Sequence, residues 1–102
     1  MDRQAKHIAG LLKVLANENR LLILCELIKG PKNVSCLCDK IPNITQSALS
    51  QHLALLKAHG ILDFSKSGQS VTYSIADQRM GEIISVLKKH YCDFLDVEGE
   101  AK

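Results

Sequence analysis

Apolar residues recur at three- and four-residue spacing in five stretches of the chain, which predicts five helices. Two of these stretches begin with a residue that commonly caps helices. Asn17 is the predicted N-cap of the second helix and Thr45 that of the fourth. Two further stretches, residues 61–67 and 71–75, alternate apolar and polar residues, which predicts two strands with Gly68-Gln69 at the turn. The predicted helices span about residues 2–15, 17–30, 35–40, 46–59 and 77–94.

The order of these elements predicts the fold class. A short helix, a tight turn and a second helix directly before a two-stranded ribbon form a winged helix-turn-helix layout. We therefore predict a mainly α fold with a small β-hairpin wing (α+β). A chain of 102 residues is long enough for one such domain. We assign the domain to residues 1–92 and expect residues 93–102 to form an acidic, flexible tail.

The fourth predicted helix, the reading helix, has an apolar and a polar side. Ala48, Leu49, Leu53, Leu55 and Leu56 are expected to face the core. The polar side carries hydroxyl and amide groups, which donate to and accept from base edges. In the winged layout this helix enters the major groove of DNA, and the hairpin contacts the flanking backbone or minor groove. The candidate DNA-binding residues are Thr45, Gln46, Ser47, Ser50, Gln51, His52 and Lys57 in the helix, with Lys66 and Gln69 in the wing.

The distribution of charge is consistent with a polyanionic partner. The net charge of the chain is +2, but residues 93–102 carry −3, which leaves +5 on residues 1–92. No acidic residue lies between Asp39 and Asp63, a window that contains the whole reading helix. Such a window suits contact with duplex DNA.

Composition excludes several classes of protein. Hydrophobic residues make up 46% and charged residues 24%, as in ordinary globular domains, so the chain is not intrinsically disordered. No apolar run approaches the roughly 20 residues of a membrane span, and the first residues lack the apolar core of a signal peptide. A cytoplasmic location without a membrane partner is expected. Because no C-x-x-C pair, paired carboxylates or glycine-rich phosphate loop occurs, we expect neither enzymatic activity nor a cofactor.

A single copy of so small a domain reads only a few base pairs. A two-fold dimer would present two reading helices about one turn of DNA apart. The first and last predicted helices have apolar faces that a domain of this size cannot easily cover by itself. We therefore predict a homodimer through these two helices.

Three segments of the sequence resemble the ArsR/SmtB family of bacterial winged-helix repressors, over about residues 9–92. They are LLKVLANENRLLIL in the first two helices, TQSALSQHLALLKAHGIL through the reading helix and GQSVTYSI in the hairpin. The resemblance implies a homodimer that binds a palindromic DNA operator and responds to a small inducer. In that family the inducer is a reactive sulfur species or a metalloid or metal ion.

Two cysteines far apart in the sequence are the first candidate sensor. The strings RLLILCEL and LKKHYC, which contain Cys25 and Cys92, are similar to the sulfide/persulfide- and redox-responsive branch of that family. That resemblance implies a bridge between the two thiols, which switches operator affinity. The chemistry requires one thiolate nucleophile and one resolving thiol. Four cations, Arg20, Lys88, Lys89 and His90, are candidates for lowering the pKa of a nearby thiol.

Two alternative sensor sites remain open. Cys36-Leu-Cys38-Asp39 resembles the C-V-C-D motif of arsenic- and soft-metal-sensing members, and paired thiolates bind soft ions. The second alternative is a zinc site at the two ends of the last helix, with Asp77, His90 and Asp93 at the spacings found in zinc-sensing members. In that pattern Arg79 occupies the remaining ligand position, where a cation cannot bind a metal.

Overall fold

Polar side chains fix where three of the helices begin. In the computed structural model, which describes residues 2–91, Asn17, Thr45 and Asp77 each accept a hydrogen bond from a backbone N–H in the first turn of the helix that follows. These caps satisfy N–H groups that have no partner inside a helix. All three are residues that the sequence placed at helix starts. They precede α2 (Glu18–Leu27), α4 (Gln46–Ala58) and α5 (Gln78–His90).

The remaining two helices are α1 (Asp2–Leu15) and α3 (Val34–Lys40). The sequence predicted that α3 begins at Ser35, but the side chain of Asn33 caps it by accepting from the backbone N–H of Cys36 at 2.8 Å. The helix therefore begins one residue earlier. The last four residues of the final predicted helix, 91–94, extend beyond α5, and residues 92–102 lie outside the described part of the chain.

A three-stranded antiparallel sheet forms the wing. Strands β2 (Leu62–Ser67) and β3 (Ser70–Ile75) are the predicted hairpin, and Gly68 at its turn has a φ of 62°, which glycine adopts without strain. A third strand, β1 (Lys32–Asn33), pairs with β3, so the strand order is β1-β3-β2. Two residues are too few to show an alternating pattern, and the sequence did not predict β1.

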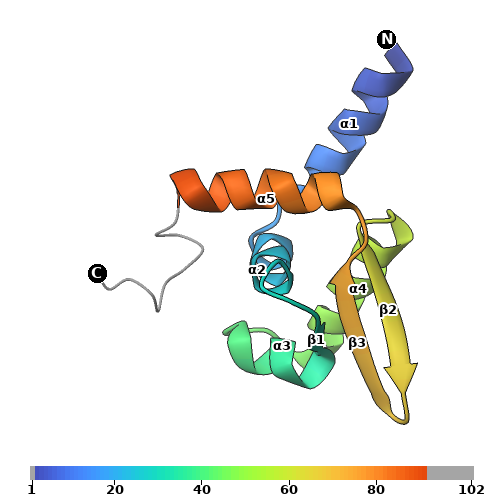
Figure 1. Cartoon of the computed structure of the whole chain (residues 1–102), viewed down its shortest axis with the longest axis vertical. Coiled ribbons are helices and arrows are strands. Elements are labelled where there is room, and N and C mark those ends of the chain that lie inside the picture. Colours follow the sequence, from blue (N-terminus) through green and yellow to red (C-terminus); the bar gives the residue numbers. More distant parts are fainter. Residues whose placement is uncertain (1, 92–102) are drawn as a thin grey trace.

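The core lies where α2 is enclosed by the other helices. α5 crosses α2 on one side and α3 and α4 pack on the other, with the wing beside α4 (Figure 1). Leu55 was predicted to face this core but is 36% exposed, because it lies beside the interior stripe of α4 rather than on it. The fully buried side chains of the core include Ile23, Leu24, Leu37, Ile41, Leu49, Leu53, Leu56, Ile61 and Ile84.

Helix α1 projects from the body of the molecule (Figure 1). Only Val14 and Leu15, at its C-terminal end, are buried. Isolated helices of this length are marginally stable in water. The greater part of α1 therefore lacks the packing that normally stabilises a helix. Between residues 2 and 91, no helix has the length and hydrophobicity needed to cross a membrane.

Candidate nucleic-acid interface

The first half of α4 presents a polar surface to solvent. Gln46, Ser47, Ser50 and Gln51 are all exposed. Leucines at positions 49, 53 and 56 of the same helix are completely buried and hold its other side against the core. Hydroxyl and amide groups on a helix fixed in this way are placed for hydrogen bonds with base edges.

The turn that leads into α4 contains the one non-glycine residue with positive φ in the described chain. Asn43 has a φ of 61°, a conformation that asparagine tolerates better than most residues. Leu37 of α3 is completely buried, so α3 is anchored on the core. The turn after α3 changes the direction of the chain at the start of α4. Thr45 then caps α4, and its Oγ1 accepts from the backbone N–H of Ala48 at 3.0 Å. The hydroxyl of Thr45 is thus already engaged in holding the start of the helix.

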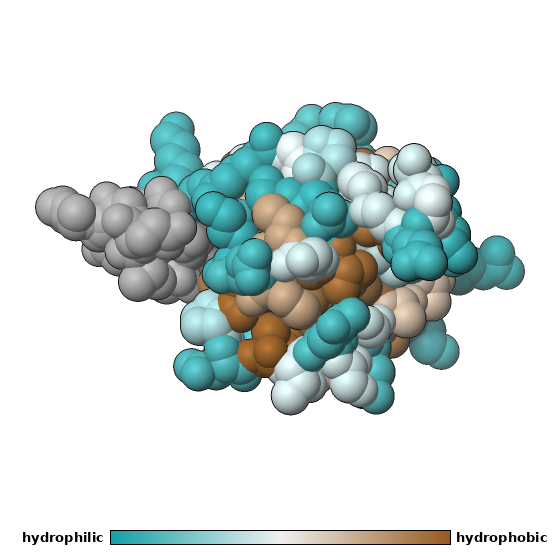
Figure 2. All heavy atoms as spheres, turned by 90° about the horizontal axis from the view of Figure 1, so that it is seen from below, coloured by the Kyte–Doolittle hydropathy of each residue, from teal (hydrophilic) through white to brown (hydrophobic). Residues whose placement is uncertain are grey.

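A groove separates the start of α4 from the wing. It has a volume of about 620 Å³. Figure 2 views the molecule from the side of α3 and the tip of the wing, where polar residues surround a patch of apolar surface. Gln46, Ser50 and Gln69, three of the predicted DNA-binding residues, line the groove from opposite sides, while Lys66 is exposed on β2 beside it. The other lining residues, which the sequence did not single out, are Asn33, Val34, Ser35, Ser67, Ser70 and Val71.

Lys57 lies near the end of α4 and is directed toward the wing. Its Nζ stands over the ring of Phe64 at 4.1 Å from the centroid, a favourable cation–π contact. The ring of Phe64 in turn lies 6.0 Å from that of Tyr73, centroid to centroid. Lys57, which the sequence predicted as a DNA-binding residue, is therefore also a link between α4 and the hairpin.

His52 differs from the other predicted DNA-binding residues because it is only half exposed. Its Nδ1 lies 3.3 Å from a guanidinium nitrogen of Arg20 on α2. Burial, together with the positive charge of Arg20, lowers the pKa of His52 below its ordinary value. Arg20 was predicted as a cation for a thiol, but its guanidinium is directed to His52 and to the carbonyl oxygen of Val14. No local pattern in the sequence indicates this contact, because 32 residues separate the two partners.

The predicted dithiol pair is only partly within the described chain. Cys25 is on α2 and is 1% exposed. Cys92 lies outside the described residues, two positions after the last residue of α5, His90. Because α5 packs across α2, the two helices that carry or precede these cysteines are neighbours.

The second pair, Cys36 and Cys38, is on α3, and both side chains are half exposed. Residues two positions apart on a helix point about 200° apart, so the two thiols do not face each other while α3 is helical. Cys38 also packs against the hydrophobic core. A shared soft-metal site therefore requires α3 to change conformation.

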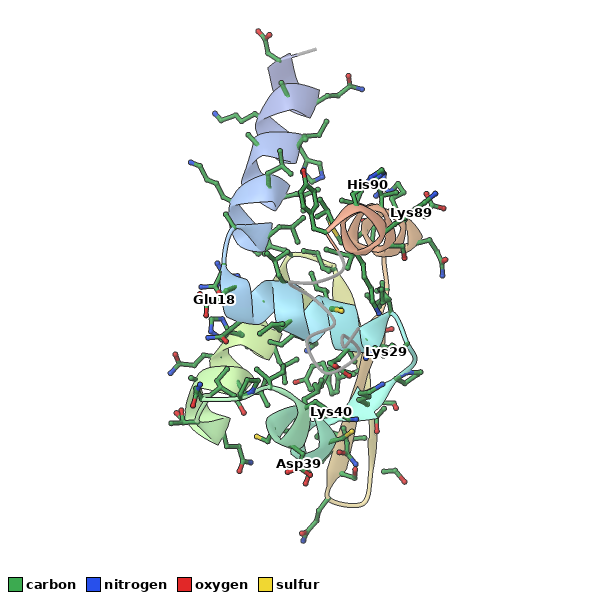
Figure 3. All side chains as sticks on the ribbon, turned by 90° about the vertical axis from the view of Figure 1, so that its left-hand side faces the viewer. Glu18, Lys29, Asp39, Lys40, Lys89 and His90 are labelled. Atoms are coloured by element: carbon green, nitrogen blue, oxygen red, sulfur yellow. The ribbon has the colours of Figure 1, made fainter. Side chains whose placement is uncertain are left out.

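The third set of residues is at the two ends of α5. Arg79 donates from Nε and Nη2 to the carboxylate of Asp77 at 3.0 and 3.1 Å, and this side-chain hydrogen bond holds the pKa of the Asp77 carboxyl below its usual range. His90 is exposed at the far end, on the opposite side of the molecule from α3 (Figure 3). Asp93 lies outside the described residues. Within residues 2–91, no three His, Cys, Asp or Glu side chains are grouped as a metal site would require.

The sequence model of a known family covers most of this architecture. The HxlR-like helix-turn-helix model matches residues 14–98. The chain belongs to the HxlR-like helix-turn-helix family. This HxlR-like protein is 36% identical over 92 residues to the HTH-type transcriptional regulator YgaV of Escherichia coli, a match that covers 90% of this chain and 93% of YgaV.

Solved structures agree with the sequence comparison. The HxlR-like protein resembles HlyU from Vibrio cholerae with a TM-score of 0.85 and 37% identity, over 90% of this chain and 99% of HlyU. A second structure of that protein, described as reduced HlyU, gives a TM-score of 0.84 and the same 37% identity over 90% of this chain and 96% of HlyU. The transcriptional repressor BigR from Xylella fastidiosa gives 0.82 at 29% identity, over 90% of this chain and 93% of BigR. The HxlR-like protein is thus a DNA-binding transcriptional regulator with a winged helix-turn-helix fold, and its relatives are transcriptional regulators rather than enzymes.

Apolar surface is concentrated on the two terminal helices of the HxlR-like protein. Ile8 and Leu12 on α1 are 54% and 55% exposed, and Ile83 on α5 is 44% exposed. These three side chains line a groove of about 300 Å³ between α1 and α5, whose other lining residues include Leu11, Leu15 and Met80. The predicted dimer helices therefore leave a shared apolar surface uncovered in the single chain.

Proposed function

We propose that this protein is a homodimeric transcriptional repressor of the ArsR/SmtB type, which reads its operator with α4 and is switched by thiol chemistry. The observation that carries the DNA-reading assignment is the row of exposed amide and hydroxyl groups on the first half of α4, which shares a groove with the wing. Helix dimensions match the major groove, and the wing then reaches the adjacent backbone.

Most of the predicted DNA-binding residues fall into two groups. Gln46, Ser47, Ser50 and Gln51 contact base edges, because they are exposed at the end of α4 that leads into the groove. The second group positions the protein on the DNA backbone, since its members are a cap hydroxyl, two lysines and a wing amide. Its members are Thr45, Lys57, Lys66 and Gln69. His52 belongs to neither group, because its ring is half buried and its Nδ1 lies against Arg20.

The experiment for the DNA-reading assignment uses duplexes that the native protein selects from a random-sequence pool. Gln51→Ala should weaken binding to the selected duplex by about 1–3 kcal/mol and relax the preference at one base-pair position in each half-site. Gln78→Ala, an exposed glutamine at the start of α5, is the matched control and should bind like the native protein. Unchanged preference in Gln51→Ala, combined with full affinity, would refute the role of α4.

In the proposed dimer, α1 and α5 of one copy pack against a second copy. Their exposed apolar side chains and the groove between them are the surface that a second copy would cover. Because the described core buries only the end of α1, pairing with a second copy also supplies the packing that this helix lacks.

In the proposed switch, Cys25 and Cys92 form a dithiol sensor whose inducer is a reactive sulfur species. Cys25 is almost completely buried, so we assign it the role of resolving thiol and Cys92 that of the thiol that reacts first. The structurally similar protein HlyU from Vibrio cholerae has a structure described as reduced, which supports a redox response in such proteins.

The chemistry balances in two steps. The Cys92 thiolate attacks the outer sulfur of a small persulfide, which gives a protein persulfide and releases the small thiol. The Cys25 thiolate then attacks Sγ of Cys92, the inner sulfur of this persulfide, which forms the Cys25–Cys92 disulfide, breaks the bond to the outer sulfur and releases it as hydrogen sulfide. A bridge between α2 and the end of α5 would alter how these helices pack, and a coupling of about 1–3 kcal/mol changes operator affinity by about 5- to 150-fold.

Mass spectrometry after exposure to a low-molecular-weight persulfide, to arsenite or to zinc tests the switch. We expect a Cys25–Cys92 bridge with persulfide, together with weaker operator binding. Cys92→Ser should retain operator binding and lose the persulfide response, whereas Cys36→Ser, the matched control on α3, should retain both. A full persulfide response in Cys92→Ser, or arsenite bound at Cys36 and Cys38 with loss of operator binding, would refute the dithiol assignment.

A further inference from the structure

The side chain of Arg20 joins three helices. Its Nε donates to the backbone carbonyl oxygen of Val14, in the last turn of α1, at 2.6 Å. A terminal guanidinium nitrogen lies 3.3 Å from Nδ1 of His52 on α4. Arg20 itself is in the first turn of α2, where its backbone N–H donates to the cap residue Asn17. One side chain thus connects the end of α1 to the middle of the reading helix.

The chemistry of this contact fixes the form of His52. A guanidinium has only donors, so Nδ1 of His52 has to accept and cannot carry a proton. The neutral imidazole then carries its proton on Nε2. Burial and the charge of Arg20 lower the pKa of His52, which agrees with a neutral ring.

The contact lies at a corner where α2 meets α4. Figure 3 shows the start of α2, marked by Glu18, directly against α4, and these two helices are in contact. α1 ends at the same corner, two residues before Asn17. A rigid link at this point therefore constrains α4 relative to α1.

We propose that Arg20 is a positioning residue for operator recognition, which holds α4 at a fixed angle to α1 through His52. The inference rests on the proposed function, because α1 is there part of the dimer surface and α4 reads the bases. In such a dimer the angle between α1 and α4 sets the distance and orientation between the two reading helices. Two half-sites are bound together only if that geometry matches their spacing on DNA. Arg20 acts through His52 and needs no contact with the operator itself.

Variants at position 52 separate positioning from direct contact with DNA. His52→Asn keeps an acceptor oxygen near the place of Nδ1, whereas His52→Gln places its amide near Nε2. If Arg20 positions α4, His52→Asn should bind the selected duplex within about threefold of the native protein, and His52→Gln about tenfold more weakly. Any other order of the three affinities would overturn the proposal.

A second measurement uses Arg20→Met, with Arg3→Met as the control for loss of one charge at an exposed position of α1. Arg20→Met should lose about tenfold in affinity for the two-half-site duplex relative to Arg3→Met, but no more than about twofold for a duplex with a single half-site. Equal losses of affinity for the one-half-site and the two-half-site duplex would overturn the proposal. Such a result would mean that Arg20 affects DNA contacts within a single subunit, which both duplexes share.

Nitrogen-15 NMR of the imidazole gives a readout that does not depend on DNA. In the native protein we expect His52 as the neutral form with its proton on Nε2, and in Arg20→Met a mixture of both neutral forms. A native His52 with its proton on Nδ1 would overturn the proposal even if Arg20→Met fails to fold. Failure of the native protein to select any duplex would refute the proposed function instead, and the NMR result would still stand.

Discussion

Shortening Leu12 to alanine tests the proposed dimer, because Leu12 lines the apolar groove between α1 and α5. Its neighbours in the groove, Ile8 and Ile83, are also about half exposed. Leu12 is outside the cluster of buried residues that forms the described core, so the core does not depend on its side chain. The substitution should therefore leave the fold of the single chain intact.

The magnitude follows from the exposed fraction of the side chain. Complete burial of a leucine side chain stabilises by about 1.5–3 kcal/mol. Leu12 is 55% exposed, so a partner can bury about half of it, which corresponds to about 1 kcal/mol. A two-fold axis repeats the contact, so Leu12→Ala removes up to about 2 kcal/mol from association and raises the dimer Kd by up to about 30-fold.

Sedimentation velocity over a concentration series measures this Kd. Leu55→Ala, a leucine on α4 that is 36% exposed and lies away from α1 and α5, is the matched control and should dimerise like the native protein. Thermal unfolding of Leu12→Ala at a concentration where it is dimeric checks that the fold persists. An unchanged dimer Kd for Leu12→Ala would refute the assignment of this surface to the dimer.

Three further predictions concern the reading helix and the wing. Thr45→Ala removes the cap of α4 and should lower the free energy of unfolding by about 1 kcal/mol, measured by urea denaturation, whereas an unchanged value would contradict the capping role. Lys66→Ala should weaken binding to all duplexes alike and reduce the slope of log affinity against log salt by about one, and a loss confined to the selected sequence would contradict a backbone contact. The pKa of His52 is lowered in the folded protein, so the folded state favours the neutral imidazole. The contribution of His52 to the free energy of unfolding is therefore complete above pH 6.5, its pKa in the unfolded chain, and is lost as the pH falls through its lower pKa in the folded protein. Native protein should thus lose more stability than His52→Asn between pH 7 and pH 5, and equal losses would contradict this assignment.

Most of the fold could be predicted because its signals are local. The caps at Asn17, Thr45 and Asp77 and the glycine at position 68 act on residues a few positions away, so the sequence around each contains the complete interaction. The helix-turn-helix followed by a hairpin then follows from the order of the elements. The exposed polar side of α4 was predictable for the same reason, since a helix with leucines on one side leaves the other to water.

Contacts between distant segments were not predictable from such patterns. β1 consists of two residues that become a strand only because β3 lies beside them. The partner of Arg20 is 32 residues away on another helix, and the sequence assigned this cation to a thiol instead. The exposure of Leu55 likewise depends on which neighbours the tertiary packing places next to α4.

The position of Lys57 has a consequence for the energetics of nucleic-acid binding. A long cationic side chain that moves in solvent loses rotational freedom when a phosphate captures it, at a cost of about 0.5–1.5 kcal/mol. The ammonium group of Lys57 is already held over the ring of Phe64 before any DNA arrives. Much of that entropy is therefore lost when the polypeptide folds, and association with a duplex begins from a side chain that is already ordered.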